Sequence, residues 1–93
     1  MFPDDQTLIA RGKQATLLKE RREQIERVQN VCKFVQGQVA LMLHGVQKRP
    51  PQDVTEQVQG SNKALENAFK AQVRIIELST EIDSLEEEAW GKK

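Results

Sequence analysis

The sequence predicts an all-α fold: an antiparallel two-helix hairpin of coiled-coil type, completed to a bundle of four or more helices by oligomerisation or by a partner chain. The 93 residues are 38% hydrophobic, 4% aromatic and 30% charged, with three prolines and five glycines, a composition typical of long helices. Apolar residues recur at alternating spacings of three and four in both halves of the chain. A single proline pair separates these halves.

The pair Pro50-Pro51 divides the chain, because paired prolines remove backbone donors and push the preceding residue out of the helical conformation. Two long helices joined by so short a connection favour an antiparallel hairpin. The expected elements, in one domain of residues 1–93, are a helix over about 4–46, a turn over about 47–52 and a helix over about 53–90.

Local signals support these boundaries. Gly45 is expected to adopt a left-handed conformation near the end of the first helix, with Val46 folding back on the helix as in a Schellman cap. Asp53 and Glu56 have the spacing of a capping box, which predicts the start of the second helix. Gly91 is expected to stop that helix.

A heptad stripe in the first helix predicts the seam against the second helix, and Arg21 interrupts it. Three further apolar residues, Val31, Phe34 and Leu41, lie off this stripe and call for another neighbour. The stripe consists of Leu18, Ile25, Cys32, Val39 and Val46, with Val28, Val35 and Met42 between them.

The second helix carries two apolar stripes. The first consists of Ala64, Ala68, Ala71, Ile75, Leu78, Ile82, Leu85 and Ala89, and the second of Val58, Leu65, Phe69, Val73 and Ile76. The hairpin register places Cys32 near Phe69, so the second stripe is expected to pack within the hairpin. The first stripe is then left without a partner inside the chain, and we expect another chain to cover it.

This allocation predicts an intermolecular surface. Trp90 has two interpretations: it closes the open end of the hairpin against Phe2, Leu8 or Ile9, or it anchors a partner. The predicted partner interface consists of Val31, Phe34, Leu41, Ile75, Leu78, Ile82, Leu85 and Trp90.

Charge supports the hairpin direction. Fourteen acidic and fourteen basic residues give a formal net charge of zero. Seven bases and three acids lie between Arg11 and Lys33, whereas six acids and no base lie between Glu77 and Glu88. Antiparallel helices bring these two segments side by side, and each exposed pair contributes about 0 to 1 kcal/mol.

No pattern of catalytic residues is present. His44 has no serine or second acid near it in sequence, and Cys32 is expected in the helix seam. Neither a phosphate-binding glycine loop nor metal-ligand spacing occurs, so we expect no enzyme activity, catalytic site, cofactor or metal. The acidic N-terminus lacks the pattern of a secretory signal, and no apolar run is long enough for a membrane span. We therefore expect a cytoplasmic protein.

The expected function is a non-enzymatic protein–protein interaction module, a helical-hairpin subunit or adaptor of a multi-chain assembly. The chain is expected to assemble either with copies of itself, with a dimer favoured, or with a different protein in a hetero-complex. One alternative is a small helical chaperone that masks a client helix, for example of a secretion apparatus. Another is a nucleic-acid-binding hairpin, which glutamates between the bases and the zero net charge disfavour. The bases it would use are Arg11, Lys19, Arg22 and Arg27.

Overall fold

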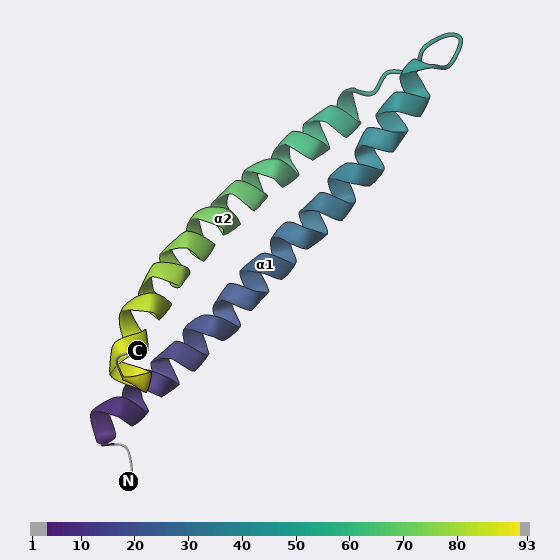
Figure 1. Ribbon diagram of the computed structural model, residues 1–93. Coiled ribbons are helices and arrows are strands. Elements are labelled where there is room, and N and C mark those ends of the chain that lie inside the picture. The colour runs from purple at the N-terminus through teal and green to yellow at the C-terminus, as the bar shows by residue number, and fades with distance from the viewer. Residues whose placement is uncertain (1–3, 92–93) are drawn as a thin grey trace. The chain divides into compact units, whose positions relative to one another are not determined.

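The structure, a computed structural model, describes residues 4–91 of the chain. In this part it is all helical, without strands, and two helices pack against each other. Helix α1 spans Asp5–Val46 and helix α2 spans Thr55–Trp90 (Figure 1). The all-α prediction is confirmed for the described residues, and completion of a larger bundle by further chains stays a prediction. None of the helices described is long and apolar enough to cross a membrane.

Aspartates cap the starts of both helices. The Asp4 carboxylate accepts the backbone N–H of Thr7 at 2.7 Å, and this bond lowers the pKa of Asp4. The Asp53 carboxylate accepts the hydroxyl and the backbone N–H of Thr55, which lowers the pKa of Asp53. Asp53 therefore caps through the residue two positions on, and not through the reciprocal pairing with Glu56 that a capping box requires.

Helix α1 continues through Gly45 to Val46, and Gly45 does not have a positive φ. The predicted left-handed cap at this position is therefore wrong. What the position requires is a small residue, because an added Cβ would lie 2.9 Å from Cγ1 of Val54. The Gly45 carbonyl accepts backbone N–H groups from Lys48 at 3.3 Å and Gln52 at 2.9 Å, which ties the connection to the helix end.

Helix α2 ends with a glycine in the left-handed conformation. Gly91 has a φ of 85°, and its N–H donates to the Glu87 carbonyl at 2.7 Å. Only glycine adopts this conformation without steric cost. The predicted stop at Gly91 is confirmed.

The contacts divide the chain into two compact units, each built from both helices. The terminal unit contains residues up to 25 and residues from 72 onward, and the turn unit contains residues 26–71. Each unit is described below by itself.

In the terminal unit the segments of α1 and α2 run antiparallel. Arg11 bonds to Ala89, whereas Glu20, nine residues later in α1, bonds to Arg74, fifteen residues earlier in α2. The largest fully buried side chain among the described residues is Leu78 of this unit, with no exposed surface. The other buried apolar residues of the unit are Ala10, Ile82 and Ala89.

The turn unit is also antiparallel, since Gly45 lies against Val54 at the connection while Phe34 lies against Gly60 further along. Its helix interface is narrow. Ala71 is the buried apolar residue of this unit, and buried Ser61 lies on the same face of α2. The half-buried residues between and beside them are mostly small or polar, among them Gln57, Ala64 and Ala68.

Candidate interaction surface

A buried amide links the two helices of the terminal unit. Gln14 is 5% exposed, and its side-chain NH₂ donates to the Glu86 carboxylate at 2.7 Å and to the Ile82 carbonyl at 3.4 Å. Its side-chain oxygen accepts the indole N–H of Trp90. Because buried polar groups are costly when unpaired, this set of bonds fixes the register of the two segments.

Trp90 closes this end of the terminal unit through polar contacts. The Arg11 guanidinium carbon lies 4.2 Å from the centroid of the Trp90 ring, and the Arg11 Nε–H donates to the Ala89 carbonyl at 2.8 Å. Leu8 and Ile9 remain 51% and 57% exposed, so these predicted apolar partners are not buried. Phe2, the third predicted partner, lies outside the described residues. Trp90 itself is 59% exposed, and its role as a partner anchor stays a prediction.

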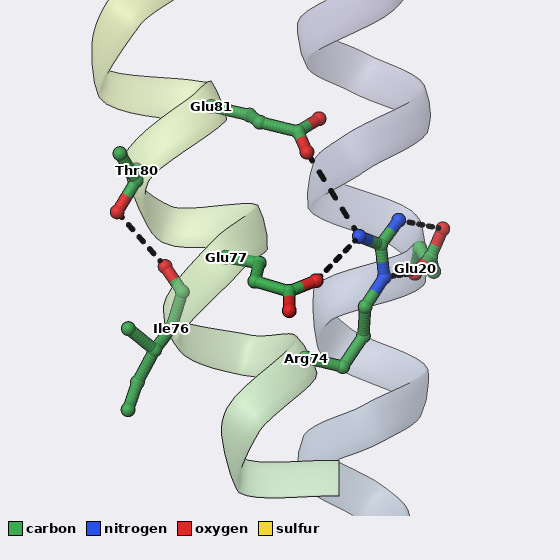
Figure 2. Close-up of polar contacts among 6 residues, drawn as sticks. All are labelled: Glu20, Arg74, Ile76, Glu77, Thr80 and Glu81. Atoms are coloured by element: carbon green, nitrogen blue, oxygen red, sulfur yellow. Dashed lines mark hydrogen bonds and ion pairs between the residues drawn. The ribbon is translucent and has the colours of Figure 1, made fainter. Parts of the chain in front are cut away.

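An ion-pair network joins the helices at the end of the terminal unit away from Trp90. Figure 2 shows the Arg74 guanidinium between three carboxylates. It contacts Glu20 of α1 at 2.6 Å and 3.2 Å, and Glu77 and Glu81 of its own helix at 3.2 Å and 3.8 Å. The hydrogen bonds that Arg74 donates to Glu20 lower the pKa of Glu20, and those that it donates to Glu20 and Glu77 raise its own pKa. The predicted direction of the helices is correct here, but in this pair the base belongs to α2 and the acid to α1.

The turn unit leaves polar atoms unpaired between its helices. Oε1 of Gln57 and Oγ of Ser61 are buried and make no hydrogen bond. In the terminal unit, Nε of Arg21 is in the same condition, at the position where the sequence had indicated a charge within the seam. Buried groups without partners weaken the interface that contains them.

Large apolar side chains lie on the outside of the turn unit. They include Phe34, Val39, Leu41, Leu43, Val46, Val58, Leu65 and Phe69, which are 42% to 64% exposed. An open groove of about 540 Å³ lies along α2, lined by Asn62, Leu65, Glu66, Phe69 and Lys70. Between its helices the unit has half-buried Val28, Val31, Val35 and Met42 of α1 against mostly small or polar residues of α2, and many of its large apolar side chains lie outside, which is uncommon in a soluble domain.

Sequence analysis assigned the two stripes of α2 the wrong way round. Leu78 has no exposed surface and Ile82 has 9%, so the stripe that was expected to lack an intrachain partner packs against α1. Phe69 and Ile76, which were expected inside the hairpin, are 64% and 57% exposed. Small residues on the first stripe permit close approach of the helices, and large aromatic or branched side chains do not fit in so narrow a space.

The predicted seam of α1 is wrong in part for the same reason. Cys32 is exposed, and Val39 and Val46 are 51% and 52% exposed, whereas Val31 is half-buried. The side of α1 that faces α2 also carries polar residues, among them buried Gln14. A search for the most hydrophobic stripe overlooks such a seam.

The eight predicted interface residues therefore fall into three groups. Leu78 and Ile82 are buried within the chain, Val31, Ile75 and Leu85 are half-buried, and Phe34, Leu41 and Trp90 are exposed. The reason for placing Leu78 at an intermolecular surface no longer holds, because α1 already covers it. A contact of the exposed members with a partner stays a prediction.

Exposed residues that sequence reasoning missed are Leu43, Val58 and Leu65 of the turn unit. The available signal was the unbroken alternation of three and four in the alanine-containing stripe, which marks the intrachain seam and leaves the other stripe outside. His44 is exposed, and the described residues contain no group of three or more His, Cys, Asp or Glu side chains able to hold a metal ion.

Comparison with known proteins gives no relative: no family model, no curated protein and no solved structure matches the chain.

Proposed function

We propose that the chain is a non-enzymatic protein–protein interaction module, a helical-hairpin subunit of a multi-chain assembly. One observation carries the proposal, namely the group of large apolar side chains on the outside of the turn unit. Eight large apolar residues are 42% to 64% exposed there, while Gln57 and Ser61 occupy the space between the helices with unpaired oxygens.

The energetic argument concerns the exposed apolar area. Complete burial of one Val, Leu or Phe side chain contributes about 1.5 to 3 kcal/mol. Burying the remaining half of four such side chains therefore contributes about 3 to 6 kcal/mol per chain. For two chains this is comparable to the cost of association, about 4 to 15 kcal/mol. A weak or moderate complex is therefore expected unless the partner adds further contacts.

The two units divide the work in this proposal. The terminal unit has its own buried residues and a network of interhelical bonds, so it holds the hairpin closed. The turn unit has few such contacts and offers its outer face to a partner.

The experiment compares the chain with a variant whose outer face is polar. Val58, Leu65 and Phe69 are replaced together by Gln, and the control replaces Leu8 and Ile9 of the terminal unit by Gln. Mass is measured by light scattering for each purified chain over a range of concentrations, and again after mild cross-linking and isolation from native extract. The proposal predicts a complex that the first variant loses and the control retains. The proposal is contradicted if the wild-type chain is a folded monomer and no protein is isolated with it from native extract in stoichiometric amount.

A further inference from the structure

The two flanks of the helix interface differ in the turn unit. On one flank Phe34 of α1 lies over α2, since a Cβ built on Gly60 would be 3.8 Å from the end of its ring. This flank of the turn unit is thus marked by a direct contact between the helices.

The opposite flank of the turn unit has uncharged side chains at two heptad positions of each helix, with Glu66 and Lys70 beside it in the groove that Asn62, Leu65 and Phe69 line. A two-fold rotation relates two antiparallel helices, so equivalent positions of their heptads lie on the same side of the pair. On this side α1 contributes Gln29, Cys32, Gln36, Val39, Leu43 and Val46, and α2 contributes Thr55, Val58, Asn62, Leu65 and Phe69. We call these residues the neutral flank.

The lack of charge is confined to this surface. Charged residues make up 30% of the chain, and the rest of the turn unit includes Arg27, Lys33, Lys63 and Glu66. Every residue of the neutral flank is exposed to solvent, where charged side chains are normally common. Six of its members, Val39, Leu43, Val46, Val58, Leu65 and Phe69, are among the large apolar residues with 42% to 64% exposure.

A neutral surface is suited to meeting itself. In an isologous dimer the same patch lies on both sides of the interface, so any single-sign cluster of charge would be opposed by its own copy. Gln29, Gln36 and Asn62 carry amides, which both donate and accept hydrogen bonds and therefore pair with identical groups. A surface for a different protein commonly uses complementary charges to select and orient it, and this flank has none.

We propose that the neutral flank is the surface on which a second copy of this chain packs, so that the turn units of two copies form a four-helix bundle. The inference rests on the proposed function and names its partner. Along the helix axis the flank extends over about 17 residues of α1, or roughly 25 Å. Across the hairpin it covers two helices, roughly 18 Å in total. A footprint of roughly 450 Å² per copy lies below the standard interface size, which favours a weak dimer.

The test uses two leucines with nearly equal exposure. Leu65 on the neutral flank is 50% exposed, and Leu8 of the terminal unit, outside the proposed interface, is 51% exposed. Sedimentation of the full chain between about 5 and 500 µM gives the dimer dissociation constant. Leu65→Glu is expected to raise this constant by at least about tenfold, because it buries a charge in the interface. The control Leu8→Glu is expected to change it less than about twofold. Leu41→Glu, at a 54% exposed position off the neutral flank, shows whether the other exposed apolar residues of the turn unit make the contact instead.

Cys32 supplies a second readout without further mutation, since it is the single cysteine and lies on the neutral flank. Its alkylation by N-ethylmaleimide is expected to slow as the wild-type concentration rises, and to remain concentration-independent in Leu65→Glu. Helicity by circular dichroism is followed in each variant. If Leu65→Glu loses helicity, Phe69→Glu at the 64% exposed position replaces it in both assays.

The outcomes separate this inference from the proposed function. A wild-type monomer throughout the range overturns the homodimer, and the proposed function survives if a stoichiometric partner is isolated from native extract. A dimer that Leu41→Glu dissociates and Leu65→Glu leaves intact overturns the neutral flank alone. A monomer with no partner in native extract overturns both.

Discussion

Replacement of Leu78 by Ala tests the assignment of the α2 faces. Leu78 has no exposed surface and lies in the terminal unit, where it packs against α1. Leu→Ala substitutions at such positions cost about 2 to 5 kcal/mol, the sum of lost transfer free energy and of the cavity that remains. A two-helix interface can close around a cavity more readily than a globular core, so we expect about 2 to 3 kcal/mol. Ala has the highest helix propensity, and therefore the loss arises from packing.

The matched control is Leu8→Ala in the same unit, where the leucine is 51% exposed. We expect this change to alter the free energy of unfolding by less than about 1 kcal/mol. Both values are measured by urea unfolding, followed by circular dichroism at one fixed protein concentration, because self-association makes stability depend on concentration. Equal effects of the two substitutions, or a cost at Leu78 below about 1 kcal/mol, would refute the face assignment.

Three further experiments test particular contacts. Gly45→Ala is expected to lower the free energy of unfolding by about 1 kcal/mol or more, because its Cβ collides with a side chain across the connection. Gly37→Ala, whose Cβ meets nothing within 4 Å, is expected to raise the free energy of unfolding by about 0.5 to 1 kcal/mol. Thermal melts compare the two variants, and equal shifts of the melting temperature would contradict the steric explanation. The pKa of Glu20 is lowered in the folded chain by hydrogen bonds from Arg74. The stabilisation of the fold by ionised Glu20 is therefore complete above its ordinary pKa of 4.5 and is lost as the pH falls through the lowered pKa. The free energy of unfolding, measured from pH 7 to pH 2, should depend less on acid in Glu20→Gln, and an unchanged profile would count against a stabilising ion pair. Arg11→Met removes the cation above the Trp90 ring, and such an interaction contributes about 0.5 to 1 kcal/mol at exposed sites. The fluorescence anisotropy of this single tryptophan should fall, and its quenching by acrylamide should rise. Unchanged values would show that other contacts hold the ring.

The local features of the fold were largely accessible from the sequence. Proline disrupts a helix whatever surrounds it, so Pro50-Pro51 indicated the connection between the helices. Gly91 likewise indicated the end of α2 through its own conformational freedom. Such signals depend on a residue and its immediate neighbours, and they are therefore readable without knowledge of the tertiary contacts.

The faces were not accessible in the same way. Gln14 is buried because Trp90 and Glu86, more than seventy residues away in the chain, satisfy its amide. From the sequence alone, a stripe that contains glutamine and arginine is predicted to face solvent, because the partners of these side chains are not known. The alanines on α2 misled the prediction in the other direction, because their small apolar area made their stripe look a weaker seam than the one with Phe69. Close packing of the helices favours these small side chains over the larger Phe69.

The candidate surface follows from this reassignment. Once α1 covers Leu78 and Ile82, eight of the fourteen exposed large apolar residues that the structure describes lie in the turn unit, and they differ from most of the interface predicted from the sequence. The surplus of apolar surface was predicted correctly in kind, but its position depended on which stripe closes the hairpin. Phe34 is the predicted intermolecular residue of this unit with the clearest double role, since it covers Gly60 and is still 46% exposed.

Hydrogen exchange measured as a function of protein concentration tests the central claim most directly. The terminal unit has its own buried residues and interhelical bonds, whereas in the proposed function a partner covers the outer face of the turn unit. Amides of residues 72–91 should therefore keep the same protection at all concentrations, while amides of residues 55–71 gain protection as the chain associates. Strong protection of residues 55–71 in a dilute monomer, equal to that of residues 72–91, would contradict the account.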